Sequence, residues 1–372
     1  MAKIEIIDSH IVYENPLPHV HSRHGFFPGL VRLPSKDLLA LFVRGEAFES
    51  PDSTTYVSRS KDDGRTWTLQ GPLYDKNQLG FETSDSLKPT PLANGSLVAM
   101  GYRFHRLDPE SGIGIEETNG LLPGDDLISF SNDEGHTWST PKVIAHKRPE
   151  LLEISGPCIE LHSGDLIAVA GLLTLPDGTT PSGQGGVLLR SSDLGHHWDD
   201  SVSFFQAPNK NISAWEPRIC EMEAGCLVII FWAYDIVGKV HLPNQVVISN
   251  DDGYTWSEPL STGQKGQAAN LTYLGGNYLL TIQTHREDES ALYVRLVELR
   301  NGTWNVLAEK AIWGAALHSS QSNNEKIVTQ FKSLRFGQPS LLLLGDDQVL
   351  ATHWSVEDGQ GRIRAHRLRF QL

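Results

Sequence analysis

The chain has 372 residues, of which 39% are hydrophobic, with 34 glycines and 20 prolines. This composition supports a large core with many tight turns, and no low-complexity run indicates a disordered segment. The net charge of −14, without any basic stripe, argues against nucleic acids and anionic membranes as partners.

The first residues, MAKIEIIDSH, lack the apolar core of a secretory signal, and no stretch of the sequence approaches a membrane span. The three cysteines, Cys158, Cys220 and Cys226, fit a reduced interior, where a free thiol packs as a small apolar side chain. We therefore predict a cytoplasmic protein.

An octapeptide recurs four times along the chain, and a shortened copy occupies residues 300–304. The four copies are SKDDGRTW (60–67), SNDEGHTW (131–138), SSDLGHHW (191–198) and SNDDGYTW (249–256). Its aspartate can accept hydrogen bonds from turn N–H groups, and its glycine permits a positive φ. The acidic spacing does not fit a calcium loop. We therefore predict that these aspartates are structural.

A second repeat lies upstream of the octapeptides, and in each copy an anchor residue precedes an alternating strand, a turn and an apolar strand. The anchors are Pro28, Pro89, Pro157, Pro217, Asn270 and Pro339. Their spacings of 53 to 69 residues suit one four-stranded antiparallel blade each. The sequence thus predicts an all-β fold, a single six-bladed β-propeller over residues 1–372. Residues 4–12 should pair with residues 362–370 and close the ring.

This topology brings the residues around each anchor and after each second strand to one face, opposite the octapeptides. Carboxylates, cations, imidazoles and amides meet there, and aromatic side chains can stack on sugar rings. We predict that a carbohydrate site is lined by His24, Arg44, Asp85, Lys88, Glu153, Arg218, His285, Arg286, Gln338, His353 and Trp354. The aromatic residues Tyr102, Trp215, Trp232 and Tyr234 fall on the same face.

Octapeptides of this kind, known as Asp boxes, on six blades resemble the sialidase superfamily over essentially the whole chain. The resemblance implies an acid at Asp52, shortly before the first box. It also implies a glutamate that supports the nucleophile, at Glu216 within Trp215-Glu216-Pro217.

The sequence departs from the sialidase pattern at three positions. Phe26 stands where the first carboxylate-binding arginine is expected, and Phe231 and Trp232 stand near the second, while Arg286 matches the third. Gln338 stands where the nucleophilic tyrosine is expected. Without two of the arginines, bidentate recognition of a carboxylate is lost. We therefore expect a substrate other than sialic acid; exo-arabinanases with this architecture likewise lack the arginine triad and use two carboxylates.

The leading hypothesis is an exo-acting glycoside hydrolase that removes a terminal sugar, with Asp52 as acid and Glu216 as second carboxylate or orienter. Glu153 and Asp85 are alternatives for the second carboxylate. Structural readings stay open, because Glu216 can pair with Arg218 and Asp52 can cap its loop. Two other functions also stay open: a lyase acting on a uronic-acid glycoside, and a non-catalytic carbohydrate-binding propeller.

No cofactor fingerprint or phosphate loop is found in a suitable context. The histidines His19, His21 and His24 form the segment HVHSRH, but on an extended chain His24 faces away from the other two. No nearby carboxylate or cysteine completes a ligand set, so we expect no metal. The oligomeric state is not indicated by the sequence.

Overall fold

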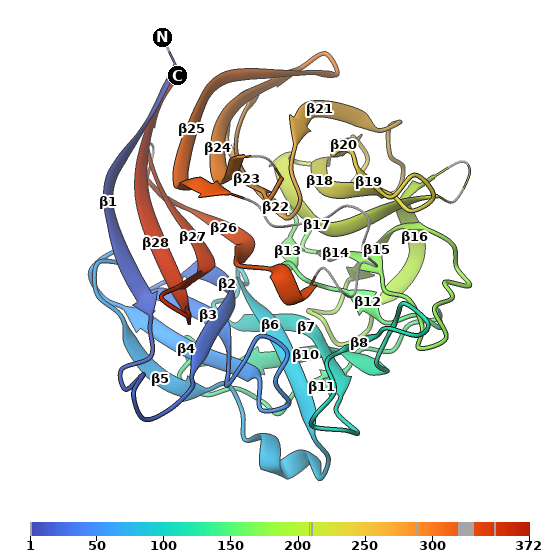
Figure 1. Ribbon diagram of the computed structural model, residues 1–372. Helices are drawn as coiled ribbons and strands as arrows, with labels where there is room; N and C mark the ends of the chain where they lie inside the picture. The colour runs from blue at the N-terminus through green and yellow to red at the C-terminus, as the bar shows by residue number, and fades with distance from the viewer. Residues whose placement is uncertain (1, 208, 210, 288, 319–330, 346) are drawn as a thin grey trace.

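The computed structural model describes residues 2–207, 209, 211–287, 289–318, 331–345 and 347–372, which form six antiparallel sheets around a central axis (Figure 1). The predicted six-bladed β-propeller is confirmed. The described helical segments are two short 3-10 turns, η1 (Lys76–Leu79) and η2 (Phe331–Ser333). No helix in this part of the chain is long and apolar enough to cross a membrane.

The strands of the first three blades follow one another along the chain, from the axis outwards. Blade 1 contains β2 (His24–Arg32), β3 (Leu38–Gly45), β4 (Thr54–Ser60) and β5 (Thr68–Pro72). Blade 2 contains β6 (Thr83–Pro91), β7 (Leu97–His105), β10 (Gly124–Ser131) and β11 (Lys142–Val143). Blade 3 contains β12 (Leu152–Glu153), β13 (Ile159–Glu160), β14 (Leu166–Leu172), β15 (Gly185–Ser191) and β16 (Asp199–Gln206).

The remaining blades have the same order, except that the last one takes its outer strand from the N-terminus. Blade 4 contains β17 (Ile212–Glu223), β18 (Cys226–Asp235), β20 (Pro243–Ser249) and β21 (Leu260–Lys265), with the short β19 (Val240–His241) beside β18. Blade 5 contains β22 (Ala269–Gly275), β23 (Tyr278–His285), β24 (Glu289–Arg300) and β25 (Thr303–His318). Blade 6 contains β26 (Phe336–Gly345), β27 (Gln348–Glu357), β28 (Gln360–Gln371) and β1 (Lys3–Tyr13). A hairpin of β8 (Gly114–Ile115) and β9 (Gly120–Leu121) lies within the β7–β10 connection.

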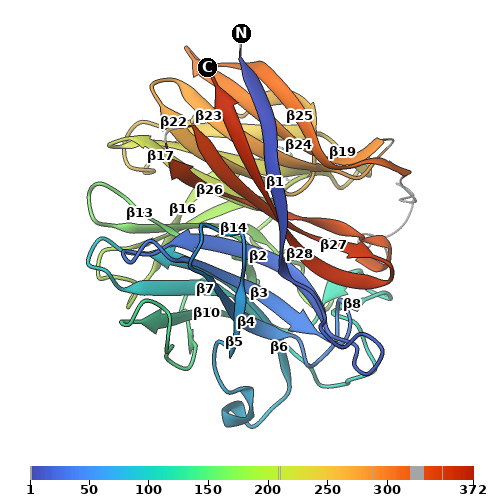
Figure 2. The same ribbon diagram turned by 90° about the vertical axis from the view of Figure 1, so that its left-hand side faces the viewer.

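Ring closure occurs in blade 6, where β1 pairs antiparallel with β28. Ile4 lies opposite Phe370 and Ile11 opposite Arg364, as the sequence predicts. The two termini therefore lie side by side, which Figure 2 shows. Because the first and last strands share one sheet, the ring cannot open without breaking this ladder.

The four octapeptides form turns that repeat one set of hydrogen bonds. In blade 1 the Thr66 N–H donates to Asp62 Oδ1 at 2.9 Å, and the Gly64 N–H donates to Ser60 Oγ at 2.8 Å. The same bonds recur in the other three turns. Hydrogen bonds from Thr255 lower the pKa of Asp251 to about 2. The predicted structural role of these aspartates is confirmed.

Within the described residues, six apolar clusters lie between neighbouring blades, one for each pair, and a smaller seventh contains Phe104 and Leu121. Each octapeptide tryptophan packs into the cluster shared with the preceding blade; Trp67, for example, joins blade 6 residues. The turn glycine lies just as close, since a Cβ at Gly64 would come within 2.8 Å of Leu350. These turns therefore fix how one blade packs on the next.

Candidate active site

A cavity of about 500 Å³ opens on the face where the inner strands begin, opposite the octapeptide turns. Its lining comes from the starts of β2, β6 and β17, the ends of β7 and β18, and the connecting loops. The volume lies within the range of small-ligand sites. The structure thus places a cavity on the face that the repeat pattern selects.

Aromatic side chains form two sides of the cavity. Trp215 stacks on Tyr234 with ring centroids 5.0 Å apart and meets Trp232 edge-on at 5.1 Å. Across the cavity, Phe48 packs on Trp354 at 5.3 Å. Flat apolar faces on two sides suit the faces of a sugar ring or of an aromatic leaving group.

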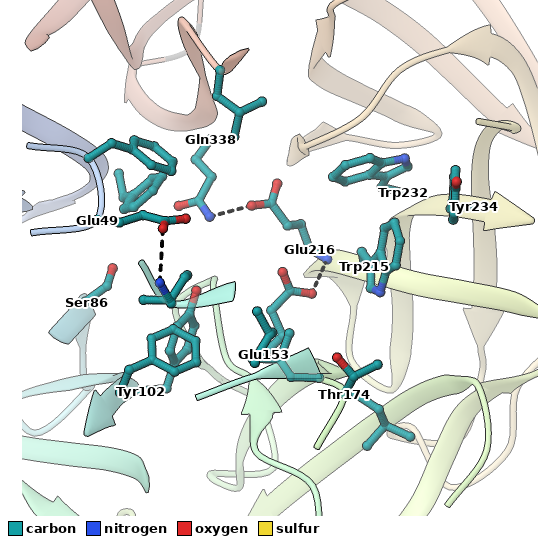
Figure 3. Close-up of a pocket in the computed structure, with 18 of the residues that line it drawn as sticks. Glu49, Ser86, Tyr102, Glu153, Thr174, Trp215, Glu216, Trp232, Tyr234 and Gln338 are labelled. Carbon is teal, nitrogen blue, oxygen red and sulfur yellow. Dashed lines mark hydrogen bonds between the residues drawn. The ribbon is translucent and has the colours of Figure 1, made fainter. Parts of the chain in front are cut away.

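Glu216 lies at the floor between these walls, on a backbone that few side chains adopt (Figure 3). Its φ is 45°, at an interruption of the β17–β18 register just before Pro217. Phe27 and Gln338 have φ values of 54° and 37° at the matching positions of blades 1 and 6. Such conformations cost of order 1–3 kcal/mol each and cluster at functional sites. All three residues line the cavity.

The two carboxylate oxygens of Glu216 have different surroundings. Oε1 accepts a hydrogen bond from Gln338 Nε2 (Figure 3). Oε2 is buried and has no hydrogen-bond partner among the residues that the structure describes. Gln338 Oε1 and Trp354 Nε1 are likewise buried without a hydrogen-bond partner in the described part of the chain. Two acceptors and one donor at the floor are therefore without a hydrogen-bond partner in the described part of the chain, which is unusual for buried polar atoms.

Three buried basic side chains lie around Glu216. Lys88, Arg218 and Arg286 are each no more than 6% exposed; desolvation lowers the pKa of each, and the charge of Glu216 opposes this shift. In the described part of the chain none of them forms an ion pair with Glu216 within 4.0 Å. Glu216 therefore lies among basic side chains without a direct ion pair to any of these three.

Two of these side chains, Arg218 and Arg286, are fixed by other contacts. Arg286 donates to Phe336 O at 2.9 Å and to Gln267 Oε1 at 2.7 Å. Arg218 Nη1 donates to Ser155 Oγ at 2.9 Å and occupies the space that a Cβ on Gly156 would need. These contacts hold Arg218 and Arg286 in place next to Glu216.

Glu153 is the second carboxyl group at the floor. Its Oε2 accepts a hydrogen bond from the Glu216 backbone N–H at 2.9 Å. Desolvation, followed by the negative charge of Glu216, raises the pKa of Glu153 well above its usual range. Two neighbouring carboxyl groups in one desolvated site favour a single shared charge, so Glu153 is the one expected to hold a proton.

Seven predicted residues do not line the cavity. Lys88 and Arg218 are buried next to residues that do, whereas the other five lie elsewhere, and the structure corrects their placement. Asp52 and Arg44 line a separate pocket of about 320 Å³, where Asp52 Oδ1 accepts from the Glu46 N–H at 3.0 Å. His24 accepts from the Gly361 N–H at 2.8 Å, and His285 packs beside Tyr293. Asp52 therefore caps its own loop, which is the structural alternative that the sequence left open.

The fifth, His353, is buried inside blade 6. Its Nε2 lies 3.0 Å from His366 Nε2, and His366 Nδ1 lies 2.8 Å from Ser9 Oγ. Consecutive residues of a strand point to opposite sides. Trp354 faces the cavity, so His353 cannot.

The remaining predicted residues meet at the cavity, although in different ways. Glu153, Glu216, Arg286, Gln338 and Trp354 line it, while Lys88 and Arg218 lie just beneath. Asp85 also lines it, but both of its oxygens are occupied, with bonds from Thr54, Thr55 and Tyr74 at 2.8–2.9 Å. Asp85 therefore holds blades 1 and 2 together and has little capacity left for a substrate.

The sequence interpretation missed Glu49, which faces the cavity across from Glu216 (Figure 3). Its Oε2 accepts from the Ile113 N–H at 3.0 Å, and burial raises the pKa of Glu49. The sequence does contain a signal for this residue: Glu49 is a second acidic residue in the same loop, three positions before Asp52. Among the described residues, no group of three histidine, cysteine or acidic side chains is placed to hold a metal ion.

Comparison of the sequence finds no match among protein families or curated proteins. Solved structures do match. A protein of unknown function from Dyadobacter fermentans is 18% identical, with a TM-score of 0.76 over 99% of both chains. An α-L-arabinanase from Penicillium chrysogenum, solved with arabinobiose, is 17% identical, with a TM-score of 0.65 over 98% of both chains.

A sialidase from Streptococcus pneumoniae is 12% identical, with a TM-score of 0.65 over 97% of this chain and 70% of that one. At such identities the likeness is one of fold. The chain has the fold of the sialidase-like β-propellers, which the sequence resemblance predicts. What the chain does must be inferred from its own cavity.

Proposed function

We propose that this protein is an exo-acting glycoside hydrolase that removes an uncharged terminal sugar from a small glycoside. One observation carries the proposal: two carboxyl groups, Glu153 and Glu216, share the floor of one cavity in unlike environments. Glycosidic cleavage needs one carboxyl group that carries a proton and one that is ionised.

The surroundings assign the two roles. Glu153, whose pKa is raised by desolvation, protonates the glycosidic oxygen as the bond breaks. Glu216, which lines the cavity and has no partner for Oε2 among the described residues, acts as the second carboxylate at the anomeric carbon. Gln338 orients Glu216 through its amide. Glu153 therefore replaces Asp52 as the proposed acid.

In the described part of the chain, the lining lacks the arginine pair that would bind the carboxylate of an acidic sugar. Four carboxyl groups (Glu49, Asp85, Glu153 and Glu216) and two basic residues, Arg286 and Lys239, line the cavity. A sialic or uronic acid would bring its own carboxylate close to these acids, and among the described residues no pair of arginines lines the cavity to bind it bidentately. The arabinobiose complex of the similar arabinanase is consistent with a neutral sugar in a propeller of this shape.

The test is a panel of nitrophenyl glycosides and natural oligosaccharides with arabinosyl, rhamnosyl, uronyl and sialyl ends. We expect turnover of at least one neutral glycoside and a loss of at least ~1,000-fold in Glu216→Gln. Turnover confined to uronyl substrates, with a product absorbing in the near ultraviolet, would instead identify a lyase. Binding of glycans without any turnover would contradict enzymatic activity altogether.

A further inference from the structure

Ser86 and Lys88 form a close pair on β6, the inner strand of blade 2. Residues two apart on a strand point to the same side. Lys88 Nζ lies 2.8 Å from Ser86 Oγ. Ser86 is partly exposed and lines the cavity, on the side of Glu49 (Figure 3), whereas Lys88 is 2% exposed. A hydroxyl that faces the ligand space is thus backed by a buried amine.

Lys88 is poorly solvated for a charged ammonium group. An ammonium offers three N–H donors, and Ser86 Oγ is its one hydrogen-bond partner within the described part of the chain. The ring of Phe27 lies over it at 5.9 Å, and a Cβ on Gly29 would come within 2.8 Å of its Cδ. The side chain is therefore fixed in place and kept from water.

The charges that face Lys88 act in both directions. Desolvation first, and then Arg218 of β17, lower the pKa of Lys88 to about 7, while Glu216 and Asp85 oppose them. The amine can therefore lose its proton far more easily than an exposed lysine, which leaves a lone pair for the Ser86 proton. A lysine in this state can serve as a general base.

We propose that Ser86 and Lys88 are a nucleophile and its base, and that they cleave a small ester, such as an acetyl group, on a sugar bound in this cavity. The sugar part of this inference depends on the proposed function; the ester chemistry does not. A serine paired with a lysine base is an established variant of nucleophilic hydrolysis.

The reaction balances with water as the only co-substrate. Ser86 Oγ attacks the acyl carbon while its proton passes to Lys88 Nζ, and the sugar oxygen leaves with that proton. Water then loses a proton to Lys88 and attacks the acyl-serine, which releases the carboxylic acid and restores the Ser86 hydroxyl.

Tyr102 supplies a donor for the negative charge that develops on the acyl oxygen. It lies directly opposite Ser86 in the β6–β7 ladder and lines the same cavity. Paired residues project to the same side of a sheet. Burial and the nearby Glu153 raise the pKa of Tyr102, so its hydroxyl keeps the proton that it would donate.

The experiment uses the full chain with p-nitrophenyl acetate, an ester without a sugar, and with an alkyl fluorophosphonate that labels activated serines. We expect ester hydrolysis that rises through the pKa of Lys88 near 7, and one label on the peptide containing Ser86. Ser86→Ala and Lys88→Met should each reduce hydrolysis at least ~100-fold, and the double variant no further. Ser96→Ala, in the distant β6–β7 turn, is the matched control.

Ester hydrolysis that survives Ser86→Ala, or a label on another residue, would overturn the assignment. Ser86→Ala removes one oxygen from a partly exposed position, so it remains informative if Lys88→Met fails to fold. Glycoside turnover is measured on unacylated substrates. Failure of the ester assay and failure of the proposed glycosidase are therefore separate results.

Discussion

The octapeptide turns and the cavity floor use the same unusual backbone for opposite purposes. In the turns, Asp63 and Glu134 have φ values of 55° and 56°. The aspartate that precedes each of them accepts a hydrogen bond from a backbone N–H of the same octapeptide. At the floor, Glu216 and Gln338 have similar φ values but leave buried polar atoms unpaired. In the turns, local hydrogen bonds compensate for the strained backbone, so the strain serves the scaffold. At the floor, the strained residues leave polar atoms without partners among the described residues, which is typical of a functional site.

The largest expected effect separates the two carboxyl groups at the floor. Glu216→Gln should reduce turnover of every glycoside at least ~1,000-fold, because an amide cannot replace the second carboxyl group that the reaction needs. Glu153→Gln should reduce turnover of a phenyl glycoside similarly, but a 2,4-dinitrophenyl glycoside by less than ~10-fold, because that leaving group needs no proton. Steady-state kinetics on both substrates provide the measurement.

Neither substitution should lower the melting temperature appreciably, since the floor is not optimised for stability. If both variants lost the two activities equally, the acid would have to lie elsewhere, and Glu49 would be the next candidate. A large loss of stability in Glu216→Gln would favour a structural role for this residue.

The turns should show the reverse behaviour. In Gly135→Ala a Cβ at φ 79° would meet Leu39 of the preceding blade at 2.7 Å, so strain and overpacking add. We expect a loss of about 3–4 kcal/mol in the free energy of unfolding, with kcat unchanged in the folded protein. Urea denaturation measures the first quantity.

Gly95→Ala is a matched control, because Gly95 has φ 85° and no atom within 4 Å of its Cβ position. It should lose only the backbone contribution, about 1 kcal/mol. An equal loss in both variants would show that contact with the preceding blade adds nothing.

Ring closure contains a buried pair whose effect depends on pH. Desolvation and Arg364 lower the pKa of His366 to about 4, and the pKa of His353 is lowered as well. The unfolded chain takes up protons near pH 6.5, but the folded chain does not until about pH 4. Stability is therefore full above pH 6.5 and falls by about 3 kcal/mol between pH 6.5 and 4 through His366.

Unfolding free energies measured from pH 7 to pH 4 test this expectation. The His366→Gln variant should be less stable at pH 7 but should lose less on acidification than the parent chain. Parallel curves for the two proteins would show that the pair does not sense pH. Both proteins contain the same carboxylates, so subtracting one curve of unfolding free energy against pH from the other leaves the contribution of His366.

The contrast between the octapeptide turns and the cavity floor also explains which features could be predicted from the sequence. The blades follow from local signals, because turn chemistry and strand alternation act within a few residues. The floor depends on contacts between distant positions: Glu216 meets Gln338 across 122 residues and Glu153 across 63. One sequence places such residues on a common face but does not tell which oxygens remain free. Asp85, whose oxygens are all occupied, looked no different from Glu153.

The smallest expected effect concerns Asp52, three residues after Glu49 in the same loop. The family spacing selects Asp52 as the acid, whereas the structure gives Asp52 a capping bond in a separate pocket and places Glu49 in the lining of the cavity. Asp52→Asn should therefore change kcat/KM by less than about twofold, because an amide oxygen can still accept from the Glu46 N–H. Glu49→Gln should raise KM about tenfold, through a lost contact with a sugar hydroxyl worth roughly 1.4 kcal/mol.

If Asp52→Asn lost activity as Glu216→Gln does, the loop would have to rearrange on binding and the family spacing would be the better guide. If Glu49→Gln alone responds, side-chain direction within one loop, rather than distance along the chain, decides which acid reaches the site.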